Sequence, residues 1–128
     1  MRLGITTGLA FAALVGPLLQ SAWADGDPAA GRRIFTRCAA CHLINASGNN
    51  TVGPNLYKII GRKAGTVAKF EYKSKLKDST IVWTEDALED FLKDPKPRVA
   101  GSAMQTFAGI PNEKEREDLV AYIKDISK

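Results

Sequence analysis

Two cysteines three positions apart with a histidine directly after the second, Cys38, Cys41 and His42, constrain this chain more than any other feature. Thiols at this spacing can add to the two vinyl groups of a porphyrin, and the adjacent imidazole then lies against the iron. The sequence therefore predicts one covalently attached haem c, with His42 as a ligand to its iron.

A zinc site and a thioredoxin-like redox pair also use two cysteines at this spacing. Zinc sites usually take four ligands, and Cys38, Cys41 and His42 are the only Cys and His residues of the chain. A thioredoxin-like pair follows a strand, whereas the residues before Cys38 show helical spacing. Haem attachment is the interpretation that the pattern favours over these two alternatives.

Residues 1–24 have the pattern of a secretory signal peptide. Arg2 gives a basic start, residues 3–19 are largely apolar, and Ala22-Trp23-Ala24 has the small-x-small form of a cleavage site. We expect cleavage after Ala24, a domain formed by residues 25–128, and export to the bacterial periplasm. An uncleaved membrane anchor is the alternative, although the apolar run is short and Gly16-Pro17 interrupts it.

The charge balance of the chain is weak and points to no polyanionic partner. The 128 residues include 18 basic and 14 acidic side chains, a net charge of +4. No repeat of aromatic and basic residues accompanies this charge, so we do not expect nucleic-acid binding. Residues 25–128 suffice for one small domain, which we expect to be a monomer.

The first half of the domain contains two predicted helices. Asp27-Pro28 has the residues of a helix start, because Asp can cap free amide groups and Pro suits the first helical position. This helix leads into the cysteine motif. A second short helix is predicted over residues 55–60 and is ended by Gly61, while residues 64–76 are expected to be irregular.

The second half contains two further predicted helices. Thr84 is a good cap for a helix that ends at Pro95, and Asn112 caps the last helix with Glu115 reaching back. Their predicted buried faces are Ala87, Leu88, Phe91 and Leu92, then Leu119, Tyr122, Ile123 and Ile126. No strand pattern is convincing. An all-α domain of three to five short helices buries little surface by itself, so we expect it to wrap around the haem.

Met104 is the candidate for the second iron ligand. His42 is the only histidine, and Met1, the other methionine, belongs to the signal segment. A lone methionine is commonly a core residue. Here it lies in an irregular segment, residues 99–104, that can approach the iron, and His/Met coordination is a common cytochrome arrangement that raises the reduction potential.

The order and spacing of these residues resemble the class I c-type cytochromes of the mitochondrial and short bacterial kind. The resemblance runs from about Asp27 to Lys128. Besides the cysteine motif, it is carried by Gly31 and Phe35, by Gly53-Pro54-Asn55-Leu56, by residues 61–65, 70–72 and 81–83, and by Leu119 with Tyr122.

The resemblance implies the small cytochrome c fold and a role for several residues. It implies that the carbonyl of Pro54 holds the ring of His42. It also implies that Arg62, Tyr72 and Trp83 donate hydrogen bonds to a haem propionate. Without the resemblance, Trp83 would be taken as a core residue and Arg62 as a solvated charge.

The function that the resemblance implies is that of a soluble monohaem electron carrier and not of an enzyme. Its partners would be redox proteins, such as a quinol–cytochrome c reductase and an oxidase in the membrane. A peroxidase-like or gas-binding haem protein is the rival class, and it requires an open iron position. A membrane-anchored cytochrome differs only in the fate of residues 1–24.

Several positions depart from the family pattern. Phe91 stands where the family commonly has Tyr, Ala100 where it has Pro, and Ala103 where it has Lys, and segment 105–107 is one residue longer than usual. The segment around Met104 is therefore the least typical part. The docking face of the family is expected around Arg32, Arg37, Lys58 and Lys96, and it is less basic than usual.

Overall fold

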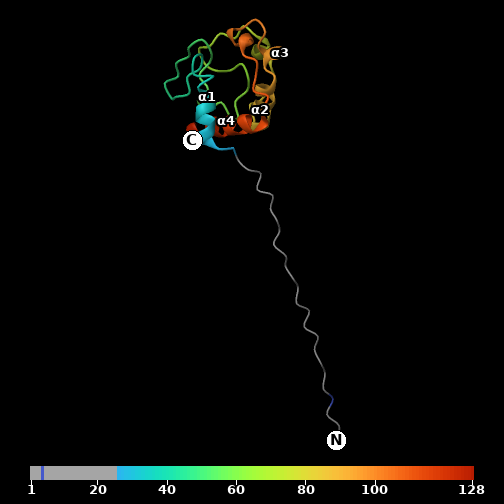
Figure 1. Ribbon diagram of the computed structural model, residues 1–128. Coiled ribbons are helices and arrows are strands. Elements are labelled where there is room, and N and C mark those ends of the chain that lie inside the picture. Colours follow the sequence, from blue (N-terminus) through green and yellow to red (C-terminus); the bar gives the residue numbers. More distant parts are fainter. Residues whose placement is uncertain (1–3, 5–25) are drawn as a thin grey trace.

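The computed structural model describes Gly4 and residues 26–128. The described residues form four α-helices and two 3-10 helices, joined by long irregular segments (Figure 1). They contain one isolated bridge, between Lys63 and Val82, and no strand. The elements are α1 (Pro28–Phe35), η1 (Lys75–Asp78), α2 (Glu85–Lys93), α3 (Lys96–Val99), η2 (Ala103–Thr106) and α4 (Glu113–Ile126). The predicted all-α fold is confirmed.

The signal peptide predicted for residues 1–24 lies outside the described residues, apart from Gly4. Within the described part of the chain, no helix has both the length and the apolar character needed to cross a membrane.

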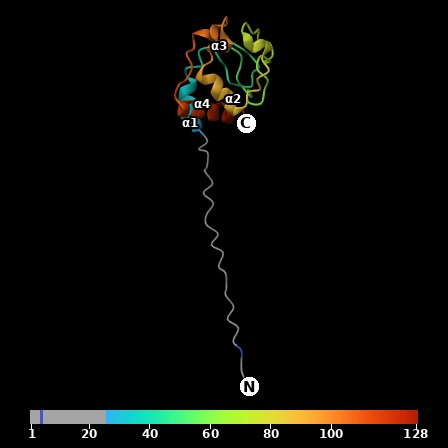
Figure 2. The same ribbon diagram turned by 90° about the vertical axis from the view of Figure 1, so that its right-hand side faces the viewer.

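Helices α1 and α4 pack against each other at one end of the molecule, and α3 lies at the other end (Figures 1 and 2). Asp27 begins α1 as predicted, because its side chain accepts the N–H of Ala29 at 2.8 Å. Gly31 lies where the two helices meet. A Cβ atom at this position would overlap the carbonyl of Asp118 and lie 2.7 Å from the Cβ of Tyr122.

We expect Gly31→Ala to lower the free energy of unfolding by about 1–3 kcal/mol, because the added methyl group forces the two helices apart. Denaturant unfolding of the haem-loaded protein measures this change. Arg33→Ala is the matched control, since Arg33 is an exposed residue of the same helix. A Gly31→Ala protein as stable as the control would show that α1 and α4 can separate at little cost.

A buried carboxylate fastens the start of α1 to α4. Asp118 accepts the backbone N–H of Asp27 at 2.7 Å and pairs with Lys114. Burial alone would raise the pKa of Asp118, but the hydrogen bonds from Lys114 and Asp27 hold it below its ordinary value. This attachment is therefore present at neutral pH and is lost as the pH falls through the lowered pKa of Asp118.

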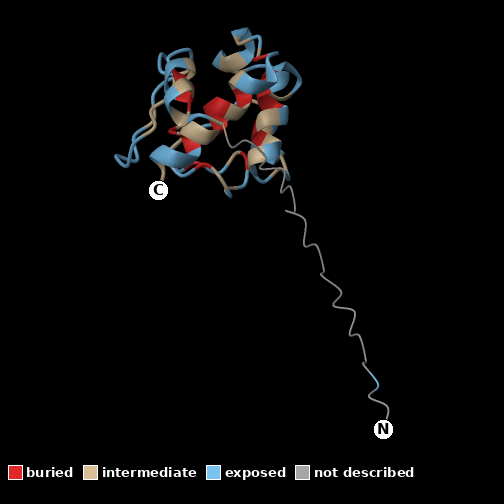
Figure 3. Ribbon diagram, turned by 60° about the horizontal axis from the view of Figure 1, so that its bottom comes forward, coloured by how far each residue is buried: buried red, intermediate tan, exposed pale blue. Residues whose placement is uncertain are grey.

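Helix α2 packs on α4, and the buried residues of the molecule gather between its helices (Figure 3). Thr84 caps α2 as predicted, since its hydroxyl accepts the N–H of Ala87 at 3.1 Å. The rings of Trp83 and Phe91 meet edge to face with centroids 4.9 Å apart. The buried core residues here are Trp83, which precedes α2, then Leu88, Phe91 and Leu92 from α2, and Leu119, Val120 and Ile123 from α4.

The short helix predicted over residues 55–60 is wrong. The side-chain oxygen of Asn55 accepts the N–H of Tyr57 at 3.0 Å, a bond of the kind that begins a helix, but no helical turn follows it. Lys58 then adopts a positive φ of 55°, which a right-handed helix does not allow. The segment is a series of turns.

Two details predicted for α4 are also wrong. Ile126 was expected to be buried, but 43% of its surface is exposed. Asn112 accepts the N–H of Glu115 at 3.0 Å as expected, but the carboxylate of Glu115 pairs with Arg37 at 3.3 Å instead of reaching back.

Helix α4 also buries Arg116, which donates to the carbonyls of Ile110 and Pro111 at 2.8 Å each and so ties this helix to the chain before it.

Candidate haem site

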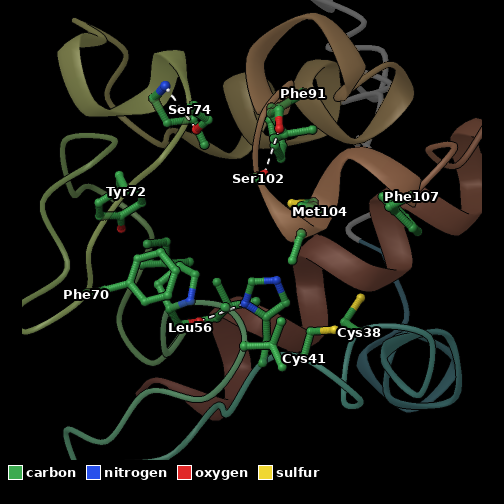
Figure 4. Close-up of a pocket in the computed structure, with 18 of the residues that line it drawn as sticks. Cys38, Cys41, Leu56, Phe70, Tyr72, Ser74, Phe91, Ser102, Met104 and Phe107 are labelled. Carbon is green, nitrogen blue, oxygen red and sulfur yellow. Dashed lines mark hydrogen bonds between the residues drawn. The ribbon is translucent and has the colours of Figure 1, made fainter.

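A cavity of about 640 Å³ lies between the helices and the irregular segments (Figure 4). Its walls are mainly apolar and come from all parts of the described chain. They include Cys38, Cys41, His42, Pro54, Phe70, Tyr72, Leu76, Trp83, Leu88, Phe91, Leu92, Val99, Met104, Phe107, Leu119 and Ile123. Seven of the eight residues predicted for the site therefore line one cavity, and Arg62 does not.

His42 is held on one wall of the cavity by a backbone carbonyl. Its Nδ1 lies 2.7 Å from the oxygen of Pro54, which places Nδ1–H as the donor and leaves the lone pair of Nε2 free. Burial lowers the pKa of His42, and the bond to Pro54 opposes this shift in part. The imidazole is therefore neutral at neutral pH, the form that binds a metal ion.

Gly53 leaves room for this ring, and the sequence pattern did not single out its role. A Cβ atom on Gly53 would lie 2.5 Å from Cε1 and 2.8 Å from Nδ1 of His42. Both distances are shorter than any van der Waals contact, so only glycine allows the ring to lie here with its bond to Pro54. The close approach becomes visible only in three dimensions.

We expect Gly53→Ala to reduce the fraction of purified chain that carries haem by about tenfold or more, the range that losing an outer hydrogen bond of a metal-binding histidine commonly costs. Haem absorbance per polypeptide measures this fraction. Asn49→Ala is the control, because Asn49 is an exposed residue of the same loop and does not line the cavity. Normal loading of the Gly53→Ala protein would mean that the position of the ring is not critical.

Cys38 and Cys41 lie together on one wall of the cavity (Figure 4). The chain keeps turning after α1, with the N–H of Ala39 bonded to the carbonyl of Phe35 at 3.0 Å and that of His42 to the carbonyl of Cys38 at 2.9 Å. Both cysteines are free and partly buried. These turns bring both thiols and the imidazole to the same cavity.

The thiol of Cys38 is protonated at neutral pH in this chain. Burial raises its pKa to about 11, although the charge of Arg37 opposes the shift. Among the described residues, no group of three or more Cys, His, Asp or Glu side chains is placed to hold a metal ion. The zinc alternative therefore finds no site in this part of the chain.

Met104 lies in η2 and lines the same cavity as the two cysteines (Figure 4). The segment that carries it is braced by its own side chains. Gln105 accepts the N–H of Gly101 at 3.2 Å, and the hydroxyl of Ser102 donates to the carbonyl of Val99 at 2.6 Å. Gln105 belongs to the stretch that is longer than the family pattern, but the sequence alone did not indicate this brace.

The three predicted propionate donors do not all reach the cavity. Trp83 and Tyr72 line it, whereas the side chain of Arg62 does not. The Tyr72 hydroxyl accepts the N–H of Val67 at 3.3 Å. Burial raises the pKa of Tyr72, and the charge of Arg62 lowers it in part. Arg62 also accepts the N–H of Trp83 through its backbone at 2.9 Å, so it supports the cavity wall from outside.

The cavity fits a haem c in both shape and chemistry. It combines apolar walls, a neutral imidazole with a free Nε2, two free thiols and a thioether. The fold and the cavity together define a small helical protein built around a covalently bound haem.

Comparisons with known proteins give the same class. The family model described as "Cytochrome c" matches residues 28–127. Similar proteins include a cytochrome c2 of Blastochloris viridis, 40% identical over 79% of this chain and 79% of its own length. A cytochrome c of Tetrahymena pyriformis is 48% identical over 80% of this chain and 91% of its own. A cytochrome c2 of Rhodoblastus acidophilus is 41% identical over 77% of this chain and 91% of its own length.

The chain therefore belongs to the cytochrome c family, and the resemblance to class I c-type cytochromes is confirmed. It binds one covalent haem c and carries single electrons between redox partners. The members of this family are electron-transfer proteins, which confirms the prediction of a carrier and not an enzyme.

Proposed function

We propose that this cytochrome is an exported carrier of the bacterial periplasm, in which His42 and Met104 would bind the haem iron and Cys38 and Cys41 would form the thioether links. The observation that carries the proposal is the bond of 2.7 Å from His42 to Pro54, because it occupies Nδ1 and leaves Nε2 free in the cavity that Met104 also lines. When bound, the haem supplies an iron that changes between the ferric and ferrous states.

The residues of the chain set the conditions for this chemistry. Pro54 fixes the ring of His42 and makes it a stronger donor. Apolar side chains such as Leu88, Phe91 and Leu119 exclude water from the cavity and thereby favour the less charged state of the cofactor. We expect Tyr72 and Trp83, which line the cavity, to donate hydrogen bonds to propionates, because buried propionates without partners would be costly.

We further propose that residues 1–24 are removed after Ala24 and that the partners are membrane redox complexes, a quinol–cytochrome c reductase and an oxidase. The signal-peptide pattern supports the first point, and the family match begins at residue 28, just after the proposed cleavage site. Two of the similar proteins are named cytochrome c2, and this supports a bacterial carrier.

Two measurements on the exported protein test this proposal. Mass spectrometry should give the mass of residues 25–128 plus one haem. The ferric protein should show the sulfur-to-iron charge-transfer band of a methionine ligand, and the ferrous protein should not bind carbon monoxide. Rapid carbon monoxide binding together with a missing band would instead favour the gas-binding class. A mass that includes residues 1–24 would favour the membrane-anchored alternative.

A further inference from the structure

One short segment, residues 62–78, has a net charge equal to that of the whole chain. Residues 62–78 contain six basic and two acidic side chains, a balance of +4, and the net charge of the whole chain is also +4. The other residues together are neutral. The segment includes η1, which packs on α3 at the end of the molecule away from α1 and α4 (Figures 1 and 2).

The lysines of this segment alternate with residues of the cavity wall. Lys73, Lys75 and Lys77 are exposed, while Tyr72, Ser74 and Leu76 between them are half-buried and line the cavity. Lys73 itself lies at the rim, and its carbonyl is 3.1 Å from the position of a Cβ on Gly101, near Met104. A protein bound to these lysines would therefore be separated from the cofactor by a single layer of side chains.

The charges of this segment are available to a partner. The ion pairs between described residues join Arg37 to Glu115, Arg98 to Asp90, Lys114 to Asp118, Lys124 to Glu85 and Lys128 to Asp125. None of them involves a lysine of residues 62–78, so none of these lysines is neutralised within the described part of the chain.

The docking residues expected from the sequence are placed less favourably. Of Arg32, Arg37, Lys58 and Lys96, only Arg37 lines the cavity. The guanidinium of Arg37 is paired with Glu115 at 3.3 Å, which reduces the charge that it offers to a partner. The unpaired positive charge at the cavity rim thus lies mainly on the side of Lys73.

We propose that five exposed lysines, the lysine strip (Lys63, Lys69, Lys73, Lys75 and Lys77), form the docking surface for an acidic face of a redox protein. The inference rests on the proposed function, since it concerns a carrier loaded with haem. Clustered charges of one sign steer an oppositely charged partner and accelerate association.

The composition of the segment favours a protein over a lipid surface. Membrane-binding segments expose large apolar side chains beside their basic residues. Here Phe70, Tyr72 and Leu76 turn toward the cavity, and Glu71 and Asp78 interrupt the positive charge. An acidic protein face can match such a mixed pattern residue by residue, whereas a uniformly anionic membrane cannot.

The test compares two double variants with the same change in net charge. The first, Lys75→Glu with Lys77→Glu, changes the lysine strip without touching a residue placed at the haem. The second, Arg32→Glu with Lys58→Glu, changes the docking residues expected from the sequence. Haem-loaded proteins are mixed with reduced flavodoxin, a soluble acidic one-electron donor, and the second-order rate is followed by stopped flow against ionic strength.

We expect the Lys75/Lys77 variant to lose about tenfold or more of its rate at low ionic strength and most of its salt dependence. The Arg32/Lys58 variant should change by less than about threefold. With cationic hexaammineruthenium as the donor, the Lys75/Lys77 variant should react faster than the native protein, which excludes a damaged haem site as the cause.

Equal losses in the two variants, or a larger loss in the Arg32/Lys58 variant, would overturn the proposal. A second pair of results would also overturn it. In these, the Lys75/Lys77 variant reacts normally with flavodoxin, but it no longer cosediments with vesicles of phosphatidylcholine and phosphatidylglycerol that bind the native protein. The lysine strip would then be a membrane-binding surface. A native protein that lacks the sulfur-to-iron band but shows the expected rates would contradict the proposed ligands and leave the docking surface intact.

Discussion

Replacing both cysteines, Cys38→Ser with Cys41→Ser, should give a chain that is largely unfolded when it is isolated without haem. The cavity of about 640 Å³ is lined by Leu88, Phe91 and Leu119, which also form the core. At about 24 cal/mol per Å³, an empty cavity of this size would cost roughly 15 kcal/mol, an upper bound because the rim is open to solvent. A domain is typically stable by only about 5–15 kcal/mol, so this cost removes most or all of its stability.

Far-ultraviolet circular dichroism and thermal melting measure this outcome. The double variant should show a large loss of helix and no cooperative transition near that of the native protein. Cys41→Ser alone is the control, because one remaining thioether link still holds the haem in the cavity. A cooperative melt with native helix content in the double variant would mean that the four helices fold without the cofactor.

The sequence predicted the helices whose ends are set by local chemistry. Asp27 and Thr84 cap their helices through side-chain bonds to the backbone two or three residues away, which a sequence pattern can indicate. The helix predicted over residues 55–60 does not form because Lys58 adopts a left-handed conformation, which stops the turn that Asn55 could begin by capping Tyr57. The apolar spacing of that stretch instead places Leu56 and Ile59 against the cavity.

The same distinction applies to the candidate site. The attachment motif and the lone Met104 could be proposed from residue types and counts, and the structure adds that they line one cavity. The need for glycine at Gly53 and the brace from Gln105 to Gly101 depend on distances between segments, which no spacing rule supplies. Arg62 was assigned by resemblance, but only its backbone carbonyl reaches the cavity wall, by a bond to Trp83, while its side chain does not line the cavity.

The distribution of charge is a further case in which three dimensions change the interpretation. The basic residues can be counted from the sequence, but the sequence does not show which of them form ion pairs. Arg37 was expected to serve docking, and Glu115, expected to bond its own helix, pairs with it instead. This ion pair therefore takes Glu115 away from the helix cap and reduces the charge that Arg37 offers to a partner. The exposed lysines of residues 62–78 then carry most of the unpaired positive charge near the cavity.

Met104→Ala should lower the reduction potential of the haem-loaded protein by on the order of 0.1 V or more, within the range of about 0.8 V over which axial ligands set haem potentials. A thioether stabilises ferrous iron more than ferric iron, so removing it favours the oxidised state. The substitution also leaves one iron position open in an otherwise apolar cavity. The ferrous variant should therefore bind carbon monoxide, and the ferric variant should lose the sulfur-to-iron band.

Thr106→Ala is the matched control, since Thr106 lies in the same turn, η2, and its hydroxyl makes only a 3.4 Å bond to the carbonyl of Ala103. This control should keep its potential, its charge-transfer band and its resistance to carbon monoxide. Voltammetry and absorption spectra of the native protein and the two variants decide the matter. If Met104→Ala keeps the native potential and the band, the sulfur of Met104 does not bind the iron. The brace formed by Gln105 and Ser102 would then support the cavity wall alone, and the high potential expected for this carrier would need another source.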